Sequence, residues 1–286
     1  MSKIYCMKLY LFTVIALLSF YTSFSQDEAV SCCAPGATEL YARNAADKNF
    51  QQMHDLPLPY VHKSDNGKDI TFKAADGSDA WGWEIKAKNP TPYYLFVIHE
   101  WWGLNDHIKK ESEKMWNDLG INVIDIDLYD KKIAATQQDA AKYMQALTTE
   151  RAQNIIKGAY AYVGKNAKVF TLGWCFGGGW SLQTALLGGK QVMGCIMFYG
   201  QPEKDIEKLK TLNADVIGFF GNKDQWPSPQ MVDEFVANMQ KAGKKLLVNR
   251  YDATHAFANP SNPNFNKEAT EDAYKKLVPF IKERIK

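Results

Sequence analysis

The chain has 286 residues, of which 46% are hydrophobic, and it carries 34 basic against 32 acidic side chains. This apolar content is enough for a large core and excludes a wholly disordered chain. The near balance of charge gives no electrostatic reason to expect a nucleic acid as a partner. Five cysteines are too few for a disulfide scaffold in a chain of this length.

Residues 1–25 have the pattern of a secretory signal peptide. Lys3 and Lys8 flank the start of a mostly apolar run, LYLFTVIALLSF, and Ser23 and Ser25 supply the small residues of a cleavage site. The run is shorter than the about 20 residues that a membrane-spanning helix needs. We therefore expect cleavage after Ser25 and a secreted or periplasmic protein with no stable membrane insertion.

The segment after the cleavage site contains two adjacent cysteines and three prolines. Residues 29–32 read AVSC, a weak match to a lipoprotein cleavage box, so a lipid anchor at Cys32 is the alternative to a soluble product. The sequence assigns no role to the pair of Cys32 and Cys33. Because residues 26–66 contain prolines and little periodicity, we expect an irregular extension that lies on the following domain.

Strand and helix patterns alternate from residue 67 to the C-terminus. Two runs of alternating polarity, 68–73 and 80–88, indicate half-buried antiparallel strands. Continuous apolar runs, typical of strands buried on both faces, follow at 93–99, 121–128, 168–174 and 192–199, and the runs at 216–220 and 245–251 complete the set of expected strands. Helix patterns occupy 106–119, 134–163 (one helix or a broken pair), 203–212, 228–241 and 267–286. This order predicts an α/β fold, with a mostly parallel central sheet and helices on both faces.

The gap between the strands expected at 192–199 and 216–220 holds one short helical stretch. A large lid domain does not fit into this gap. We therefore expect an open site that suits small substrates.

A nucleophile motif follows the strand expected at 168–174. Residues 173–178 read GWCFGG, and Cys175 takes the position in which a nucleophile elbow usually has serine. Gly173 and Gly177 would let the strand and the next helix approach closely. The helix N-terminus would stabilise both a thiolate and a developing oxyanion. The alternative is a buried structural cysteine beside a glycine-rich bend.

An acid and a histidine follow the cysteine in the order that this architecture requires. Asp224 lies just after the run at 216–220, and His255 lies in the loop after the last strand. His255 would accept the thiol proton, and Asp224 would orient its imidazole ring. These positions predict a catalytic triad of Cys175, His255 and Asp224.

Together, these motifs resemble those of the dienelactone hydrolases, a branch of the α/β-hydrolase superfamily with a cysteine nucleophile. The resemblance rests on HEWWGL at 99–104, GWCFGG at 173–178, GNKD at 221–224 and HAF at 255–257. It implies an α/β-hydrolase domain over 67–286 that hydrolyses a small carboxylic ester or lactone through a thioester intermediate.

The resemblance also implies roles for residues near the cysteine. Glu100 would interact with Cys175 and help to generate the thiolate when substrate arrives. The backbone N–H groups of Trp101 and Phe176 would form the oxyanion hole. From the residues alone, Glu100 is an acid in a loop after a buried strand, and a solvated loop acid is the alternative.

Several tryptophans lie within two residues of these positions, and we expect Trp102, Trp174 and Trp226 to line an aromatic substrate pocket. Packing of the loops is the alternative for each of them.

Gly103 stands where a zinc motif beginning at His99 would need its second histidine, and no Cys-x-x-Cys pair is present. The sequence therefore predicts no metal and no cofactor.

Two departures from the family argue against dienelactone itself as the substrate. Asn259 lies shortly after His255, where members that bind a carboxylate-bearing lactone have an arginine, and residues 130–141 offer only Lys131 and Lys132 in place of a second arginine. Secretion would also separate the protein from an intracellular pathway of aromatic degradation.

Two other functions remain open: a non-catalytic binding protein on the same fold, and an acyltransferase that uses the same thioester chemistry. The sequence determines neither the natural substrate nor the oligomeric state.

Overall fold

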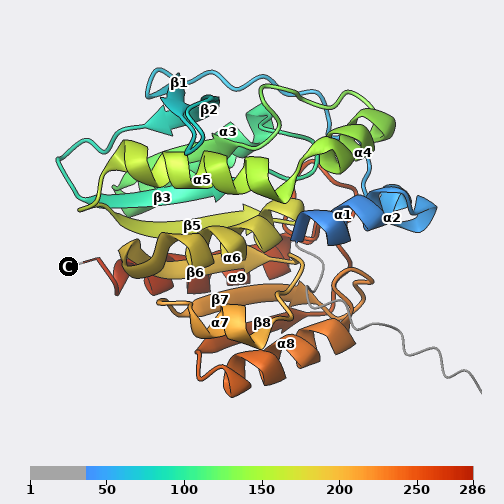
Figure 1. Cartoon of the computed structure of the whole chain (residues 1–286). Coiled ribbons are helices and arrows are strands. Elements are labelled where there is room, and N and C mark those ends of the chain that lie inside the picture. The colour runs from blue at the N-terminus through green and yellow to red at the C-terminus, as the bar shows by residue number, and fades with distance from the viewer. Residues whose placement is uncertain (1–36, 286) are drawn as a thin grey trace, which may run out of the picture. The chain divides into compact units, whose positions relative to one another are not determined.

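The computed structural model describes residues 37–285 (Figure 1). The expected signal peptide and the cysteines at positions 32 and 33 lie outside these residues. Within them, no helix combines the length and the apolar character that crossing a membrane requires.

A single sheet forms the centre of the described part of the chain. Its spatial order is β1-β2-β4-β3-β5-β6-β7-β8. The strands are β1 (Gly67–Lys73), β2 (Asp79–Ile85), β3 (Tyr93–Ile98), β4 (Asn122–Asp127), β5 (Lys168–Trp174), β6 (Val192–Phe198), β7 (Val216–Gly221) and β8 (Leu246–Tyr251). Strands β1 and β2 pair antiparallel with each other, and β2 pairs antiparallel with β4, whereas all the other pairs are parallel. The carboxyl ends of the parallel strands therefore meet at one edge of the sheet.

Helices cover both faces of the sheet, as expected for an α/β-hydrolase fold. In Figure 1, α5 and α6 lie in front of the sheet, while α3 and α9 lie behind it and contact each other. The helices after β3 are α3 (Asp106–Leu119), α4 (Gln137–Ala146), α5 (Thr149–Val163), α6 (Phe176–Gly188), α7 (Ile206–Lys210), α8 (Pro229–Lys241) and α9 (Lys267–Lys282), with a 3-10 turn, η1 (Gly189–Gln191), after α6.

The long helical pattern at 134–163 is a broken pair. Helix α4 ends at Ala146, with Leu147 as its C-cap, and the side chain of Thr148 accepts a hydrogen bond from the Arg151 N–H group to cap α5. The segment between β6 and β7 contains only the five-residue helix α7, so no lid domain is inserted there.

The expectation of an irregular extension is wrong for residues 37–52. Helix α1 (Ala37–Ala45) and helix α2 (Lys48–Gln52) form here, and the Asp47 side chain caps α2. Tyr41 and Phe50 are buried in the core, because α1 packs against α4 and α6. This N-terminal segment, residues 37–54, covers the carboxyl end of β5.

Candidate active site

Cys175 lies in the turn between β5 and α6 with a backbone geometry that non-glycine residues rarely adopt. Its φ is 54° and its ψ is −121°. Such strain persists when the surrounding structure enforces it, and it concentrates at functional sites. Gly173 and Gly177 explain how the turn is built: a Cβ on Gly173 would lie 2.0 Å from the Gly177 carbonyl oxygen, and one on Gly177 would lie 2.2 Å from the Ile98 oxygen. The turn at Cys175 therefore has the tight strand-to-helix geometry of the elbow predicted from the sequence.

The sulfur of Cys175 is almost fully enclosed, since the residue is 2% exposed. Burial raises the pKa of the thiol above its usual value, although His255 and the backbone N–H group of Phe176 act in the opposite direction. The sequence-based expectation of an open site is therefore wrong. The cover comes from the N-terminal segment, a part of the chain remote from the usual lid position.

His255 and Asp224 are in direct contact, as their order in the sequence predicts. The Nδ1–H group of His255 donates to Asp224 Oδ2 at 2.8 Å, and the backbone N–H group of Trp226 donates to Asp224 Oδ1 at 2.8 Å. Burial alone would lower the pKa of His255, but Asp224 and Cys175 outweigh it and hold this pKa well above its usual value. The Nε2 atom of His255 is buried and has no hydrogen-bond partner among residues 37–285.

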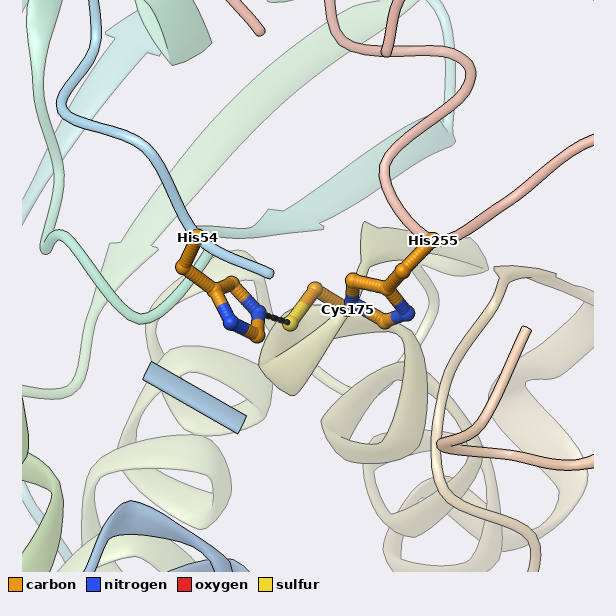
Figure 2. A group of neighbouring side chains, drawn as sticks. All are labelled: His54, Cys175 and His255. Carbon is orange, nitrogen blue, oxygen red and sulfur yellow. Dashed lines mark hydrogen bonds between the residues drawn. The ribbon is translucent and has the colours of Figure 1, made fainter. Parts of the chain in front are cut away.

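A second histidine, His54, lies against the same sulfur (Figure 2). Its Nε2 atom is 3.2 Å from Cys175 Sγ. The Nδ1–H group donates to the Phe50 carbonyl oxygen at 2.7 Å, which fixes the tautomer and leaves Nε2 as an acceptor for the thiol proton. Burial, together with the nearby His255, lowers the pKa of His54 to about 3, so this ring is neutral near pH 7.

The N-terminal segment is anchored on the site by further hydrogen bonds. The Tyr41 hydroxyl donates to the carbonyl oxygen of Cys175 at 2.9 Å and accepts from the N–H group of Gln201 at 2.9 Å. The Gln137 side chain donates to the carbonyl oxygen of His54 at 2.8 Å. His54 is therefore placed by contacts that reach α4, the elbow and the segment after β6.

Glu100 lies near Cys175 and His255, but its carboxylate is bound by the side-chain amide of Asn259 and not by the thiol. Asn259 Nδ2 donates to Glu100 Oε2 at 2.6 Å. Burial raises the pKa of Glu100 to about 7, although His255 and Asn259 act to lower it. The backbone of the same loop is fixed by His99, whose Nε2 accepts from the Leu128 N–H group while its Nδ1–H group donates to the Glu100 carbonyl oxygen.

The tryptophans predicted around the site have different surroundings. Trp101 is fully buried and stacks edge-on against Phe50 and Trp102. Trp174 lines a pocket together with Glu100 and Asn259, among other residues. Trp102 and Trp226 do not line this pocket. The predicted oxyanion donors, the N–H groups of Trp101 and Phe176, come from the loop after β3 and the first residue of α6.

The two lysines considered as replacements for substrate-binding arginines pack on aromatic rings. Lys131 Nζ lies 5.3 Å from the ring centre of Trp81, and Lys132 Nζ lies 5.8 Å from that of Tyr143. The position after His255 that would hold the other arginine is Asn259, which binds Glu100. The site thus carries no arginine in either role.

Sequence reasoning missed His54 and Tyr41 entirely. Helix α2 has five residues, too few to show a periodicity, and three prolines in the region suggested an irregular path. The available signal was Asp47, a good helix cap, followed by the apolar Phe50. That signal predicts a helix but not its contact with a cysteine 121 residues later.

Comparisons with known proteins agree with the motifs. The sequence profile of the dienelactone hydrolase family matches residues 84–285. A protein of Saccharolobus solfataricus named "Putative carboxymethylenebutenolidase" is 26% identical over 252 residues, which cover 74% of this chain and 96% of the relative.

Solved structures show the same fold. A structure titled as a putative dienelactone hydrolase from Klebsiella pneumoniae superposes with a TM-score of 0.64 at 18% identity, covering 74% of this chain and 98% of the other. A dienelactone hydrolase-like promiscuous phosphotriesterase from metagenomic libraries gives a TM-score of 0.64 at 19% identity, covering 77% of this chain and 100% of the other.

Proposed function

Because the chain belongs to the dienelactone hydrolase family and is thus a hydrolase of carboxylic esters or lactones, we propose that Cys175, His255 and Asp224 carry out this reaction. One observation carries the proposal. Cys175 is buried in a strained turn, and a ring nitrogen of the buried His255 lies within 4.8 Å of its sulfur. The Nδ1–H group of the same histidine donates to the Asp224 carboxylate. This is the arrangement that activates a nucleophile.

The first half of the reaction acylates the enzyme. His255 Nε2 accepts the proton of the Cys175 thiol, and the sulfur attacks the carbonyl carbon of the ester. Asp224 stabilises the imidazolium ion that forms, which agrees with the raised pKa of His255. The N–H groups of Phe176 and Trp101 would stabilise the oxyanion. The alcohol leaves with the proton from His255, and a thioester on Cys175 remains.

The second half returns the enzyme to its starting state. His255 accepts a proton from water, the hydroxide attacks the thioester, and the carboxylic acid leaves as the sulfur recovers its proton. Glu100 would act on the thiol indirectly in this scheme, because its side chain binds Asn259 and not the sulfur. We assign Trp174 to the substrate pocket, which it lines together with Glu100.

Turnover of p-nitrophenyl acetate by the purified protein tests the proposal. Cys175→Ala should abolish turnover, whereas Cys195→Ala should retain it, because Cys195 is a fully buried core residue that contacts Ser181. Turnover that survives Cys175→Ala unchanged would refute the assigned nucleophile. An ester formed with added alcohol would instead indicate an acyltransferase.

We also propose that the mature protein is exported and begins at Gln26, on the strength of the apolar run at residues 9–20 and the small residues before the cleavage site. N-terminal sequencing of the protein recovered from the secreted or periplasmic fraction tests this. A mature N-terminus at Cys32 would indicate a lipoprotein instead.

A further inference from the structure

His54, Cys175 and His255 form a compact group of possible metal ligands (Figure 2). One ligand atom of each lies within 4.8 Å of the other two. All three residues are buried, with exposed fractions of 4%, 2% and 2% respectively. Metal-ligand bonds of about 2.0–2.3 Å place tetrahedral ligand atoms about 3.3–3.6 Å apart. The 3.2 Å between His54 Nε2 and the sulfur is near this spacing, and the ligand atom of His255 lies within 4.8 Å of both.

Both imidazoles are oriented as metal-binding histidines usually are. In such sites the ring nitrogen that does not bind the metal donates to a carboxylate or a backbone carbonyl, which fixes the tautomer. His54 donates through Nδ1 to the Phe50 carbonyl oxygen, and His255 donates through Nδ1 to Asp224. The Nε2 lone pair of His54 faces the sulfur and becomes available when the thiol loses its proton, and the Nε2 atom of His255 has no hydrogen-bond partner in the described part of the chain.

From this geometry we propose that His54, Cys175 and His255 bind a thiophilic transition-metal ion, with Zn²⁺ as its representative. One thiolate and two imidazoles suit zinc or copper, whereas magnesium and calcium prefer oxygen ligands. Three protein ligands leave a fourth position for water. On binding, a bond forms between the metal and sulfur while the thiol proton is released to solvent. The charge of the ion and the oxidation state of sulfur do not change.

The surroundings favour retention of a bound ion. The ring of His54 packs against Phe50 and Trp101, with ring centres 4.4 and 4.5 Å away, and Tyr199 packs against His255 at 5.0 Å. These aromatic side chains keep water away from the ligands. Sequence spacing did not reveal the site, because His54 belongs to the N-terminal segment and is 121 residues from Cys175.

Metal binding and the proposed hydrolysis exclude each other. A sulfur bound to the metal is not free to attack an ester, and His255 bound through Nε2 is not free to accept a proton. The N-terminal segment thus adds a ligand that converts a pair of catalytic groups into a metal site. This inference goes beyond the proposed function and does not depend on it, because binding is measured without substrate.

The test is a titration of the full mature protein with Co²⁺ under reducing conditions, followed by competition with Zn²⁺ and with Mg²⁺. We expect one ion per chain, a near-ultraviolet charge-transfer band from a cobalt–thiolate bond, displacement by Zn²⁺ and no displacement by Mg²⁺. His54→Asn should weaken Co²⁺ binding by more than the about 10–100-fold that loss of an outer partner costs. His62→Asn removes a histidine whose Nε2 atom lies 2.9 Å from Glu113 Oε2 and not against the sulfur, and this variant should bind Co²⁺ as the wild type does.

Two outcomes would overturn the proposal. One is the absence of the thiolate band in the wild-type protein, a result that needs no variant to fold. The other is equal affinity of the wild type and His54→Asn, with His54→Gln as the second variant if the first does not fold. Ester turnover is measured separately on metal-free protein, so a hydrolase that binds no metal and a metal-binding protein without turnover are distinguished.

Discussion

Two buried histidines flank one sulfur, yet their pKa values move in opposite directions. His255 donates to the Asp224 carboxylate and its pKa rises well above the usual value, whereas His54 donates to the Phe50 carbonyl and its pKa falls to about 3. Burial penalises the charged form of both rings. The Asp224 carboxylate, and to a smaller extent Cys175, compensates a positive charge on His255. The Phe50 carbonyl raises the pKa of His54 too little to offset burial and the nearby His255.

This difference separates the two possible roles of an imidazole at the thiol. His255 can accept a proton and remain as an imidazolium ion, so it suits a general base. His54 stays neutral and can accept a hydrogen bond, but it cannot hold the proton near pH 7. The N-terminal segment therefore contributes a neutral imidazole, which accepts a hydrogen bond from the Cys175 thiol and shields the sulfur from solvent.

The largest expected effect comes from making the two histidines alike. Asp224→Asn removes the carboxylate, so the pKa of His255 should fall because its burial remains. We expect kcat for ester hydrolysis to fall by about 10²–10⁴-fold. The control is Asp252→Asn, because the Asp252 side chain is 80% exposed and pairs with Lys223 on the surface, not with a histidine. Steady-state kinetics of both variants measure the effect, and equal kcat values in the two would contradict it.

Glu100→Gln extends the comparison of the two histidines to a third buried titratable group, because Glu100 lies near His255. The pKa of Glu100 is about 7 in the folded chain, against the usual 4.5. Between these values the folded chain binds more protons than the unfolded chain, so the free energy of unfolding falls as pH rises. Gln removes this slope. Relative to the wild type, the variant should gain up to about 3 kcal/mol of stability from pH 4.5 to 8.

Denaturant unfolding of wild type and Glu100→Gln at several pH values gives this difference. Glu283→Gln, at an exposed position after α9, serves as the control and should not change the pH slope. A difference between wild type and Glu100→Gln that stays constant with pH would show that Glu100 has an ordinary pKa. Reduced turnover in Glu100→Gln at unchanged stability would support a role in forming the thiolate.

Tyr41→Phe tests how the N-terminal segment is held. The change removes the hydroxyl that accepts from the Gln201 N–H group and donates to the Cys175 carbonyl oxygen. That carbonyl oxygen still accepts from the Gly178 N–H group, but the Gln201 N–H group loses its acceptor. One unsatisfied buried group costs about 1–3 kcal/mol, and we expect a loss of stability of that size. Tyr60→Phe is the matched control, since Tyr60 is 39% exposed and, among the described residues, its hydroxyl contacts only the His62 ring, in an exposed pair; its cost should be within about 0.5 kcal/mol. Equal unfolding midpoints for the two variants would contradict the prediction.

The same two regions explain what the sequence could and could not predict. The sheet was predictable because largely buried strands such as β5 and β6 are continuous apolar runs. Cys175 and Asp224 each follow such a run, and His255 follows the last strand, β8, which is only partly buried. Parallel strands bring those ends together whatever the loop lengths. His54 follows a helix of five residues with one buried side chain, and its position depends on contacts with α4 and the elbow. Those contacts are set by tertiary packing and leave no local pattern.

Glu100 is an intermediate case. Its position after β3 places it near the site, and the sequence predicts that much. The partner of its carboxylate is Asn259, 159 residues away, and no spacing rule predicts that pair. This contact gives a reason for the neutral side chain of Asn259 at the position where an arginine was considered. The Asn259 amide binds the carboxylate of Glu100 within the protein, whereas the arginine would bind a carboxylate of the substrate.

The smallest expected effect, and the most direct test of the cover, is the reactivity of the thiol in His54→Ala. Removing the ring opens a path to a sulfur that is 2% exposed in the wild type, and it removes the acceptor of the thiol proton. Greater contact with water also reduces the burial that raises the pKa of Cys175.

We expect alkylation of His54→Ala by iodoacetamide at pH 7 to be at least about tenfold faster than that of the wild type, a change of about 1.4 kcal/mol in activation free energy. His62→Ala, which removes a ring that lies against Glu113 at 2.9 Å and does not line the pocket beside Glu100 and Trp174, should react at the wild-type rate. Peptide mass mapping assigns the label to Cys175 rather than to the core residue Cys195. If His54→Ala reacts no faster than wild type, reagents reach the sulfur by another route, and the pocket bounded by Glu100, Trp174 and Asn259 becomes the candidate entrance.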